Sequence, residues 1–434
     1  MQSNESIQWP FYAATPISQW QFNIARDTLL HRGPDAGASF FTDEVALGHR
    51  RLSIIDLTEQ ANQPMHLANR YSIVFNGEIY NYKTLKAALA IKGHTFTTNS
   101  DTEILLHLYQ AYGHKMLHKL DGMFAFAIWD NQTKELFIAR DRLGIKPLYY
   151  TQWNNYFLFA SEPKAFFAYG VPLQLNEDYV EEFQYYRHVS GENTLFTNVF
   201  QLLPGHNAII KNANHIAISC WWNLKDAVQQ HPTISNPLQW FTQTLDASVQ
   251  KHMISDVPVG LLLSGGLDSS SIGASLFKQQ FKGLCSFTMG FNNFIDDESA
   301  EAAILANAYQ LQHYSYQLTD ANLVEALQVC NTINDVPLVH HNEPHIYYVA
   351  KNAKNKITVL LSGEGADELL GGYVRYKPLQ YANFHTAISF VLQFIPKKRV
   401  NSRLEKLQHY FQANNTNELL QTNAIHWYAK DFKK

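Results

Sequence analysis

Ser264-Gly265-Gly266-Leu267-Asp268-Ser269-Ser270 lies between an apolar run, residues 257–263, and a segment with helical periodicity, residues 272–281. The apolar run has the length of a buried strand, so the sequence predicts a turn from a strand into a helix. Two adjacent glycines let the backbone approach a ligand closely, and the unpaired amides at a helix start favour an anion. The three serines add hydroxyl donors. This stretch therefore predicts a loop that binds phosphate.

The loop differs from a Walker A loop, because no Gly-Lys-Ser/Thr follows its glycines. Asp268 stands where that loop would place a lysine. A carboxylate beside phosphates requires a bridging cation such as Mg²⁺. An ordinary strand-to-helix turn would account for Ser-Gly-Gly alone, whereas the added Leu-Asp-Ser-Ser favours a phosphate site.

The composition is that of a globular protein with room for two domains, since the chain has 434 residues, of which 46% are hydrophobic and 17% charged. A net charge of −4 without a long Lys/Arg run argues against nucleic acid as a partner. Cys220, Cys285 and Cys330 have no metal-ligand spacing and predict free thiols in a reducing compartment. We find no signal peptide and no apolar run long enough to span a membrane, so we expect a cytoplasmic protein.

The first part of the chain, residues 1–205, is predicted to form an α+β sandwich of packed sheets with flanking helices. Helical periodicity covers Tyr82–Ile91 and Asp101–Tyr112. The predicted strands are short apolar segments separated by Gly, Asn and Asp turns, namely residues 45–47, 71–75, 124–129, 136–139, 149–150 and 156–160. Residues 206–235, polar and interrupted by two tryptophans, are predicted to be a linker.

Four polar clusters interrupt this pattern: residues 31–35, 49–53, 76–80 and 100–103. Arg51 is suited to bind a carboxylate with two hydrogen bonds, and Asn76 with the Gly77 amide is suited to donate to an oxyanion in acyl transfer. Glu78 and Asp101 are suited to hold an α-ammonium group. Each cluster alone is also typical of a turn or a surface ion pair. Residues 141–150 and 161–164 are predicted to have structural roles.

The second part, residues 236–434, alternates strands and helices, which predicts an α/β fold with a doubly wound parallel sheet. After a helix at residues 239–253 and the phosphate loop come predicted strands at 286–290 and 357–361, with a helix opening at 297–301. Ser362-Gly363-Glu364-Gly365-Ala366-Asp367-Glu368 follows the last of these strands. Three carboxylates within five residues repel one another unless a cation or an ammonium group is bound.

The loop at residues 264–270 resembles the pyrophosphate-binding loop of ATP pyrophosphatases, which split ATP into AMP and pyrophosphate to adenylate a substrate. Residues 359–373 narrow the resemblance, and with the four polar clusters, residues 29–376 are similar to glutamine-dependent asparagine synthetases. This resemblance implies a class II glutamine amidotransferase domain of the Ntn type followed by an ATP-pyrophosphatase synthetase domain. It also implies ATP and Mg²⁺ as cofactors, aspartate with glutamine or ammonia as substrates, and a homodimer.

The resemblance further implies a role for each matching residue. Glutamine would be bound by Arg51, Asn76, Gly77, Glu78 and Asp101. Asp268 and Asp367 would hold Mg²⁺ on the pyrophosphate, and Glu364 would be the acid/base at the nitrogen that attacks the aspartyl-adenylate. ATP would further be contacted by Leu262, Ser264, Gly265, Gly266, Ser269, Ser270, Met289, Ser362 and Gly363.

The sequence departs from the family at both ends. The family's nucleophile is an N-terminal cysteine, whereas this chain begins Met1-Gln-Ser-Asn-Glu and has Cys220 as its first cysteine. We therefore expect an inactive glutaminase half. Beyond Tyr376 the likeness fades, a family lysine cannot be placed, and the synthetase domain is expected to be truncated. His340 and His341 are interpreted as loop residues.

Three alternatives to the ligase remain. The chain would instead be a non-catalytic remnant that binds nucleotide or glutamine without turnover. A second alternative is an amide ligase similar to the β-lactam synthetases, which also lack the N-terminal cysteine. These enzymes carry tyrosine where this chain has Glu364, and glutamate favours asparagine formation. An ATP pyrophosphatase acting on tRNA would need a basic surface or paired cysteines, which we do not find.

Overall fold

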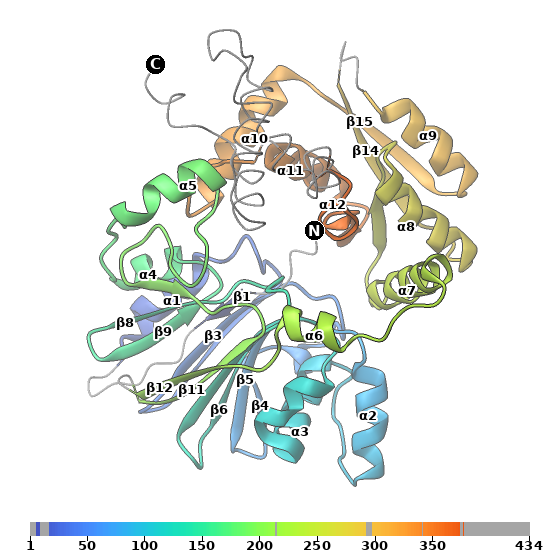
Figure 1. Cartoon of the computed structure of the whole chain (residues 1–434). Helices are drawn as coiled ribbons and strands as arrows, with labels where there is room; N and C mark the ends of the chain where they lie inside the picture. The colour runs from blue at the N-terminus through green and yellow to red at the C-terminus, as the bar shows by residue number, and fades with distance from the viewer. Residues whose placement is uncertain are drawn as a thin grey trace, which may run out of the picture. The chain divides into compact units, whose positions relative to one another are not determined.

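The computed structural model describes residues 6–8, 17–212, 215–291, 297–340, 342–373 and 376. The chain divides into two compact units, residues 1–176 with 191–362 and residues 177–190 with 363–434, and each is described by itself. The first unit contains two antiparallel sheets and one parallel sheet, and many of their strands are labelled in Figure 1.

The first antiparallel sheet has the strand order β10-β8-β9-β1-β3-β2. Its strands, in this order, are Val199–Gln201, Tyr149–Trp153, Tyr156–Ala160, Ser6–Gln8, Ala46–Arg51 and Ala36–Phe41. Its outer face is covered by α1 (Gln19–Asp27) and α4 (Lys164–Tyr169), which bury Phe22 and Phe166 against the strands.

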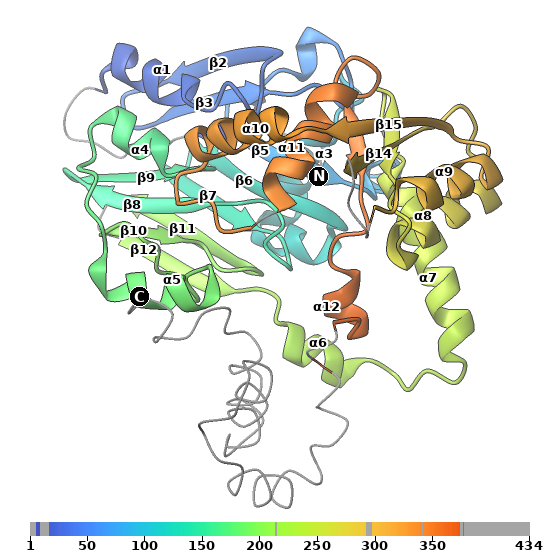
Figure 2. The same ribbon diagram turned by 90° about the horizontal axis from the view of Figure 1, so that it is seen from above.

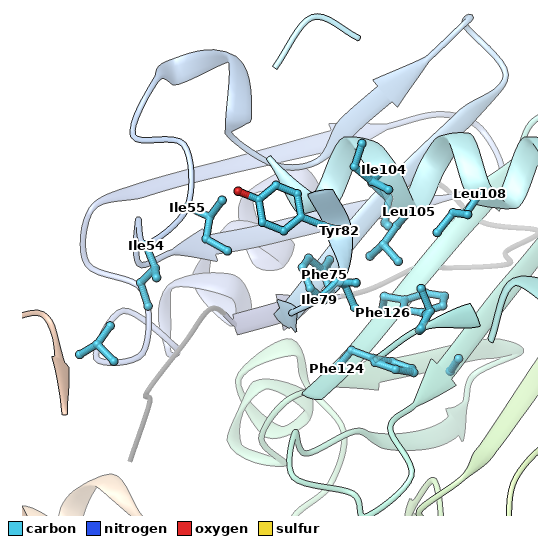
Figure 3. Packing of buried hydrophobic residues seen from close by; sticks show 14 of the residues in the cluster. Ile54, Ile55, Phe75, Ile79, Tyr82, Ile104, Leu105, Leu108, Phe124 and Phe126 are labelled. Carbon is cyan, nitrogen blue, oxygen red and sulfur yellow. The ribbon is translucent and has the colours of Figure 1, made fainter. Parts of the chain in front are cut away.

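The second antiparallel sheet has the strand order β12-β11-β7-β6-β5-β4. Its strands, in this order, are His215–Cys220, His206–Asn212, Glu135–Arg140, Gly122–Asp130, Tyr71–Ile79 and Met65–Leu67. Its outer face carries α2 (Tyr82–Ile91) and α3 (Asp101–Tyr112), and Figure 3 shows Phe75, Phe126 and Leu105 in this layer. Short 3₁₀ turns lie at Glu59–Ala61 and Gly113–Lys119.

Alternation along the strands assigns side chains to the space between these two sheets. Val45 and Leu47 share a buried cluster with Val74 and Trp129, whereas Phe75 belongs to the cluster beneath the helices. Because successive side chains of a strand point to opposite faces, even-numbered residues of β5 and odd-numbered residues of β3 face the inter-sheet space. This parity positions the polar residues of both strands.

The parallel sheet has the order β15-β14-β13-β16, and all its pairs are parallel. Its strands, in this order, are Gln312–Leu318, Cys285–Phe291, Val259–Leu262 and Val359–Leu361. The chain steps outward from β13 to β14 and β15, then returns to add β16 on the other side of β13. Ligands bind at such a reversal of strand order, outside the carboxyl ends of the strands.

Helices cover both faces of the parallel sheet. α8 (Leu267–Lys278) and α9 (Ser299–Ala308) bury Leu276 and Ala302 beside Leu261, whereas α11 (Asn342–Ala353) buries Val349 beside Phe287. Figures 1 and 2 both show α8 and α9 on one side of β14 and β15 and α11 on the other. The remaining helices of this unit are α6 (Leu224–Gln230), α7 (Pro237–His252) and α10 (Asp320–Ile333).

Three of the departures from the sequence predictions concern the neighbourhood of the phosphate loop and the predicted linker. α8 begins at Leu267 rather than near residue 272, which puts Asp268, Ser269 and Ser270 in its first turn. Strand β15 was not predicted. Residues 206–212 and 215–220 of the predicted linker form β11 and β12, and β11 pairs with β7; the domain boundaries at residues 205 and 236 stay predictions.

The second unit contains the 3₁₀ turn Glu177–Tyr179, α5 (Val180–Tyr186) and α12 (Ala366–Leu370). α12 is flanked by Gly365 and Gly371, both with left-handed backbone (φ 92° and 70°). Such a conformation is natural for glycine and strained for other residues.

Candidate functional sites

A buried polar site lies between the two antiparallel sheets. By the strand parity described above, His49 and Arg51 of β3 and Asn76 and Glu78 of β5 face the inter-sheet space. All four are at least 97% buried, with 1%, 3%, 0% and 2% of their surface exposed. Among the described residues, both polar atoms of the Asn76 carboxamide lack a hydrogen-bond partner. Buried polar groups are nearly always paired, so this carboxamide is suited to a polar ligand.

His49 was not predicted as a functional residue, although it opens one of the four polar clusters. Burial lowers the pKa of His49 to about 3, although the Phe75 backbone acts to raise it; the charges of Arg51 and Arg50 act in the same direction as burial. The imidazole is therefore neutral at physiological pH, when it carries one donor and one acceptor.

Arg51 holds the loop that follows its own strand. Nη1 donates to the Thr58 carbonyl (3.0 Å) and to Asn62 Oδ1 (2.8 Å), and Nη2 donates to the carbonyls of Ile55 (3.2 Å) and Asp56. A guanidinium has five N–H groups, and these bonds engage four of them. A ligand carboxylate bound through two hydrogen bonds must therefore displace at least one of the loop's acceptors.

Asp101 ties the end of β5 to the start of α3. Its Oδ2 accepts the Ile79 N–H at 3.0 Å, and the preceding Ser100 caps the helix by accepting the Thr102 N–H. Burial raises the pKa of Asp101 to about 6, against the hydrogen bonds that it accepts. A ligand ammonium group would lower this pKa again, because an opposite charge nearby favours the carboxylate.

Gly77 is required by the close approach of β6. A Cβ at this position would lie 2.1 Å from the Met123 carbonyl oxygen, which no side chain can tolerate. Only glycine at position 77 therefore lets β5 pack this close to β6 between Asn76 and Glu78.

The phosphate loop is preorganised by its own serines. Ser269 Oγ accepts the Ser264 N–H at 3.0 Å, and the two hydroxyls lie 2.9 Å apart. Ser264 Oγ accepts the Gly266 N–H at 3.1 Å, and Ser270 Oγ donates to the Gly266 carbonyl at 2.6 Å. Gly266 offers no side chain to cap α8, so that the first amides of this helix are left for an anion.

Gly265 is required because α9 packs close to the loop. A Cβ there would lie 2.8 Å from Glu301 Cβ and 3.1 Å from Glu298 Cβ. The loop is thus held between β13 and a helix of the neighbouring crossover.

The structure brings several of the predicted nucleotide-binding residues to one edge of the parallel sheet. Val259 of β13 pairs with Val359 of β16, so the phosphate loop and Ser362 follow the ends of adjacent strands. Leu262 and Met289 are half-buried and pack against the same hydrophobic cluster as α11. Gly363, Glu364 and Asp367 belong to the second unit, and their predicted partnership with Asp268 stays a prediction.

The structure also bears on metal-binding clusters, on the cysteines and on membrane-spanning helices. In the described ranges, no group of three or more His, Cys, Asp and Glu side chains could hold a metal ion. The three cysteines are free, as predicted. None of the helices described is both long and apolar enough to cross a membrane. His341, Met1–Glu5 and the residues after Tyr376 lie outside the described residues.

Together, these features define a protein with two candidate sites, a buried polar cluster in a β-sandwich and a serine-braced loop at the end of a strand of a parallel sheet. Comparison with known proteins matches residues 14–222 to the family model described as "Glutamine amidotransferase domain" and residues 241–433 to the one described as "Asparagine synthase". The chain belongs to the family of glutamine-hydrolysing asparagine synthetases.

Two relatives show the extent of this likeness. Asparagine synthetase [glutamine-hydrolyzing] 1 of Bacillus subtilis is 38% identical over 82% of this chain and 56% of its own length. "Putative asparagine synthetase [glutamine-hydrolyzing] 2" of Methanocaldococcus jannaschii is 30% identical over 95% of this chain and 84% of its own length. The chain thus spans little more than half of the B. subtilis relative. Glutamine PRPP amidotransferase of B. subtilis superposes with a TM-score of only 0.39 at 18% identity, covering 72% of this chain and 65% of that chain.

Proposed function

We propose that this chain is an asparagine synthetase-type ligase, which amidates aspartate with nitrogen from glutamine or ammonia and converts ATP to AMP and pyrophosphate. The observation that carries the proposal is the serine-braced loop after β13, set at the strand-order reversal beside β16. Family membership supports the substrates. The fold of the first part would be of the Ntn type and that of the second of the ATP-pyrophosphatase type.

The reaction would proceed in two steps. A carboxylate oxygen of aspartate attacks the α-phosphorus of ATP, pyrophosphate leaves, and an aspartyl-adenylate forms. The nitrogen then attacks the acyl carbon, AMP leaves, and Glu364 takes a proton from that nitrogen. The loop amides at the start of α8 would hold the leaving pyrophosphate and stabilise its charge.

A magnesium ion fits the donors that the chain offers. Mg²⁺ in nucleotide sites is held by one or two carboxylates together with phosphate oxygens, so it needs no cage of three protein carboxylates. Asp268, half-buried in the first turn of α8, and Asp367 would hold it. When bound, the ion neutralises phosphate charge.

In the sandwich, the orphan carboxamide of Asn76 and the Gly77 amide would donate to the amide oxygen of glutamine. Arg51 would bind its carboxylate, and Glu78 and Asp101 its ammonium group. Our expectation that this half is inactive concerns the residues before Ser6, which the structure does not describe, and it stays a prediction. A homodimer and a cytoplasmic location also stay predictions.

The test is aspartate-dependent release of pyrophosphate from ATP·Mg²⁺, with ammonium and glutamine as alternative donors. We expect release with ammonium in the wild type. Glu364→Gln should still form the aspartyl-adenylate and release pyrophosphate, but it should not yield asparagine. Release with glutamine would show an active glutaminase half. ATP binding without release with either donor would leave the non-catalytic remnant. Asparagine as the product would exclude the remaining alternative, an amide ligase similar to the β-lactam synthetases, which carry tyrosine where this chain has Glu364.

A further inference from the structure

Two loops of the first unit are joined by a reciprocal pair of hydrogen bonds. Asp256 Oδ2 accepts the Asp56 N–H at 2.8 Å, and the Asp256 N–H donates to the Ile54 carbonyl at 2.9 Å. Residues 54–56 follow β3, and Asp256 lies three residues before β13. The pair therefore connects the strand of Arg51 with the strand of the phosphate loop.

On one side of this pair, Asp56 is fixed by the candidate glutamine pocket. Its backbone is left-handed (φ 55°), and its carboxylate accepts the Thr58 N–H at 3.1 Å and the Asn99 N–H at 2.7 Å. Asn99 immediately precedes the cap of the helix that begins with Asp101. The Asp56 carbonyl accepts from Arg51. Two of the residues proposed to bind glutamine thus bear on the same loop.

On the other side, Asp256 leads directly into the parallel sheet. The Pro258 carbonyl accepts the Thr358 N–H at 3.0 Å, and β13 is then paired on both sides. Ile54 and Ile55 also share one buried hydrophobic cluster with Val259 and Leu261 of β13. Figure 3 labels Ile54, Ile55 and Tyr82 among the side chains of this cluster. A shift of the loop would therefore displace β13, the strand that precedes Ser264.

Binding of a carboxylate would disturb this joint. Arg51 spends four of its five N–H groups on residues 55–62, so a ligand carboxylate held by two bonds must displace at least one loop acceptor. Two of these acceptors are the carbonyls of Ile55 and Asp56, adjacent to the atoms that bond to Asp256.

We propose that Asp256 is a positioning residue, through which a ligand in the Arg51 pocket and a nucleotide at the phosphate loop change each other's affinity. The inference rests on the proposed function, because it takes the two sites to bind an amino acid and ATP. By linkage, each ligand must change the affinity of the other by the same factor.

The experiment measures L-glutamate binding by calorimetry with and without saturating ATP·Mg²⁺, in the absence of aspartate. Glutamate has the α-carboxylate and α-ammonium of glutamine but no amide to hydrolyse. In the wild-type chain we expect ATP to change the dissociation constant of glutamate at least about fivefold, the lower end of typical coupling. In Asp256→Ala we expect a factor near one, with the affinity for each ligand alone unchanged within about twofold.

Two further variants separate positioning from general damage. Asp256→Asn keeps an oxygen that accepts the Asp56 N–H and should restore the coupling. Asp121→Ala removes a different, exposed contact, the ion pair of Asp121 with Lys251 at 2.6 Å, and should leave the coupling intact. A wild-type factor of one, or an unchanged factor in Asp256→Ala, would overturn the inference while single-ligand binding still upheld the proposed function. Failure of both ligands to bind alone would overturn both.

Discussion

At the scale of single residues, the buried site is marked by polar groups that the fold does not satisfy. The Asn76 carboxamide is fully buried, yet both of its polar atoms lack partners among the described residues. Gln63, a second buried carboxamide, accepts the Phe75 N–H at 2.6 Å and donates to Thr102 Oγ1 at 3.2 Å. The two amides lie close in sequence but differ in purpose: one holds the fold together, and the other is available to a ligand.

This contrast gives the first prediction. Asn76→Ala should change the free energy of unfolding by less than about 1 kcal/mol, because the carboxamide has no hydrogen bonds to lose, and should weaken glutamine binding about tenfold. Gln63→Ala, the matched control, should cost about 1–3 kcal/mol, since it leaves the Phe75 N–H unpaired. Urea unfolding and calorimetry measure the two effects. Equal destabilisation by both substitutions would contradict the assignment.

Asp101 gives the second prediction, through the pH dependence of stability. Its pKa is raised from 3.8 to about 6 by burial, so the folded state holds the proton more tightly than the unfolded state. The contribution to stability is complete below pH 3.8 and is lost as the pH rises through 6. Asp101→Asn removes this loss and should be more stable than the wild type at pH 8 by up to about 3 kcal/mol.

The difference between Asp101→Asn and the wild type should shrink as the pH falls from about 6 to about 4. Urea unfolding across this range measures it, and a difference that does not vary with pH would count against the raised pKa. If Asp101 binds an ammonium group, glutamine affinity in the wild type should rise with pH around 6, and this rise should be absent in the variant.

At the scale of elements, the sequence predicts strands and helices well where apolar spacing is regular. α2, α3 and β9 have the predicted bounds. β15 was missed because Gln312–Leu318 mixes polar and aromatic residues at the edge of the sheet, where only Leu318 is fully buried. The start of α8 was placed late, because three consecutive serines hide the helical pattern.

The candidate sites were predictable where a residue's position in a strand decides its neighbours. Asn76 and Glu78 lie two residues apart on one strand, so the sequence predicts that both side chains face the same side. The phosphate loop directly follows another strand, so the sequence also predicts its place at the end of that strand. The engagement of Arg51 with residues 55–62 depends on how the loop after β3 folds back, and the bonds of Asp256 to Ile54 and Asp56 join residues about 200 positions apart in the chain. No local pattern signals such contacts.

The phosphate loop gives the third prediction. Gly265→Ala would place a Cβ within 2.8 Å of Glu301 Cβ, so that either the loop or α9 must move. We expect ATP affinity to fall by at least about tenfold, the equivalent of 1.4 kcal/mol. Ser271→Ala is the control, because this exposed hydroxyl only donates to the Leu267 carbonyl behind it. Equal ATP affinity in the two variants would show that the loop tolerates the displacement.

At the scale of the whole described chain, a cluster of charges links residues 31–32 and 162–164 to the segment after α10. The Glu162 carboxylate forms ion pairs with His31, with Arg32 at 2.9 Å and with Lys164 at 2.8 Å. Lys164 also lies 3.4 Å from the Asp335 carboxylate. Burial opposes ionisation of Glu162, but the hydrogen bond from His31 and the nearby cations lower its pKa to about 2. Burial raises the pKa of Asp335, and the negative charge of Glu162 raises it further. The positive charge of Lys164 lowers this pKa but only partly compensates.

Lys164→Met gives the fourth prediction. It removes the cation shared by two largely buried carboxylates and should reduce the free energy of unfolding at pH 7 by about 2 kcal/mol, less than for a fully buried pair. Because the pKa of Glu162 is lowered from 4.5 to about 2, its contribution is present above pH 4.5 and is lost as the pH falls towards 2. The variant should therefore lose less stability than the wild type across this range. Lys211→Met, at an exposed ion pair with Glu135, should have no measurable effect.

The pairing of β16 with β13 also has a consequence for how the molecule is made. Val259 and Val359 are neighbours in the sheet but are separated by 100 residues of chain. A ribosome adding about 5–20 residues per second completes β13 at least several seconds before β16. During this interval, the edge of β13 that will receive β16 is unpaired. Because pairings distant in sequence form late, we expect the candidate nucleotide site to be among the last features to appear during synthesis.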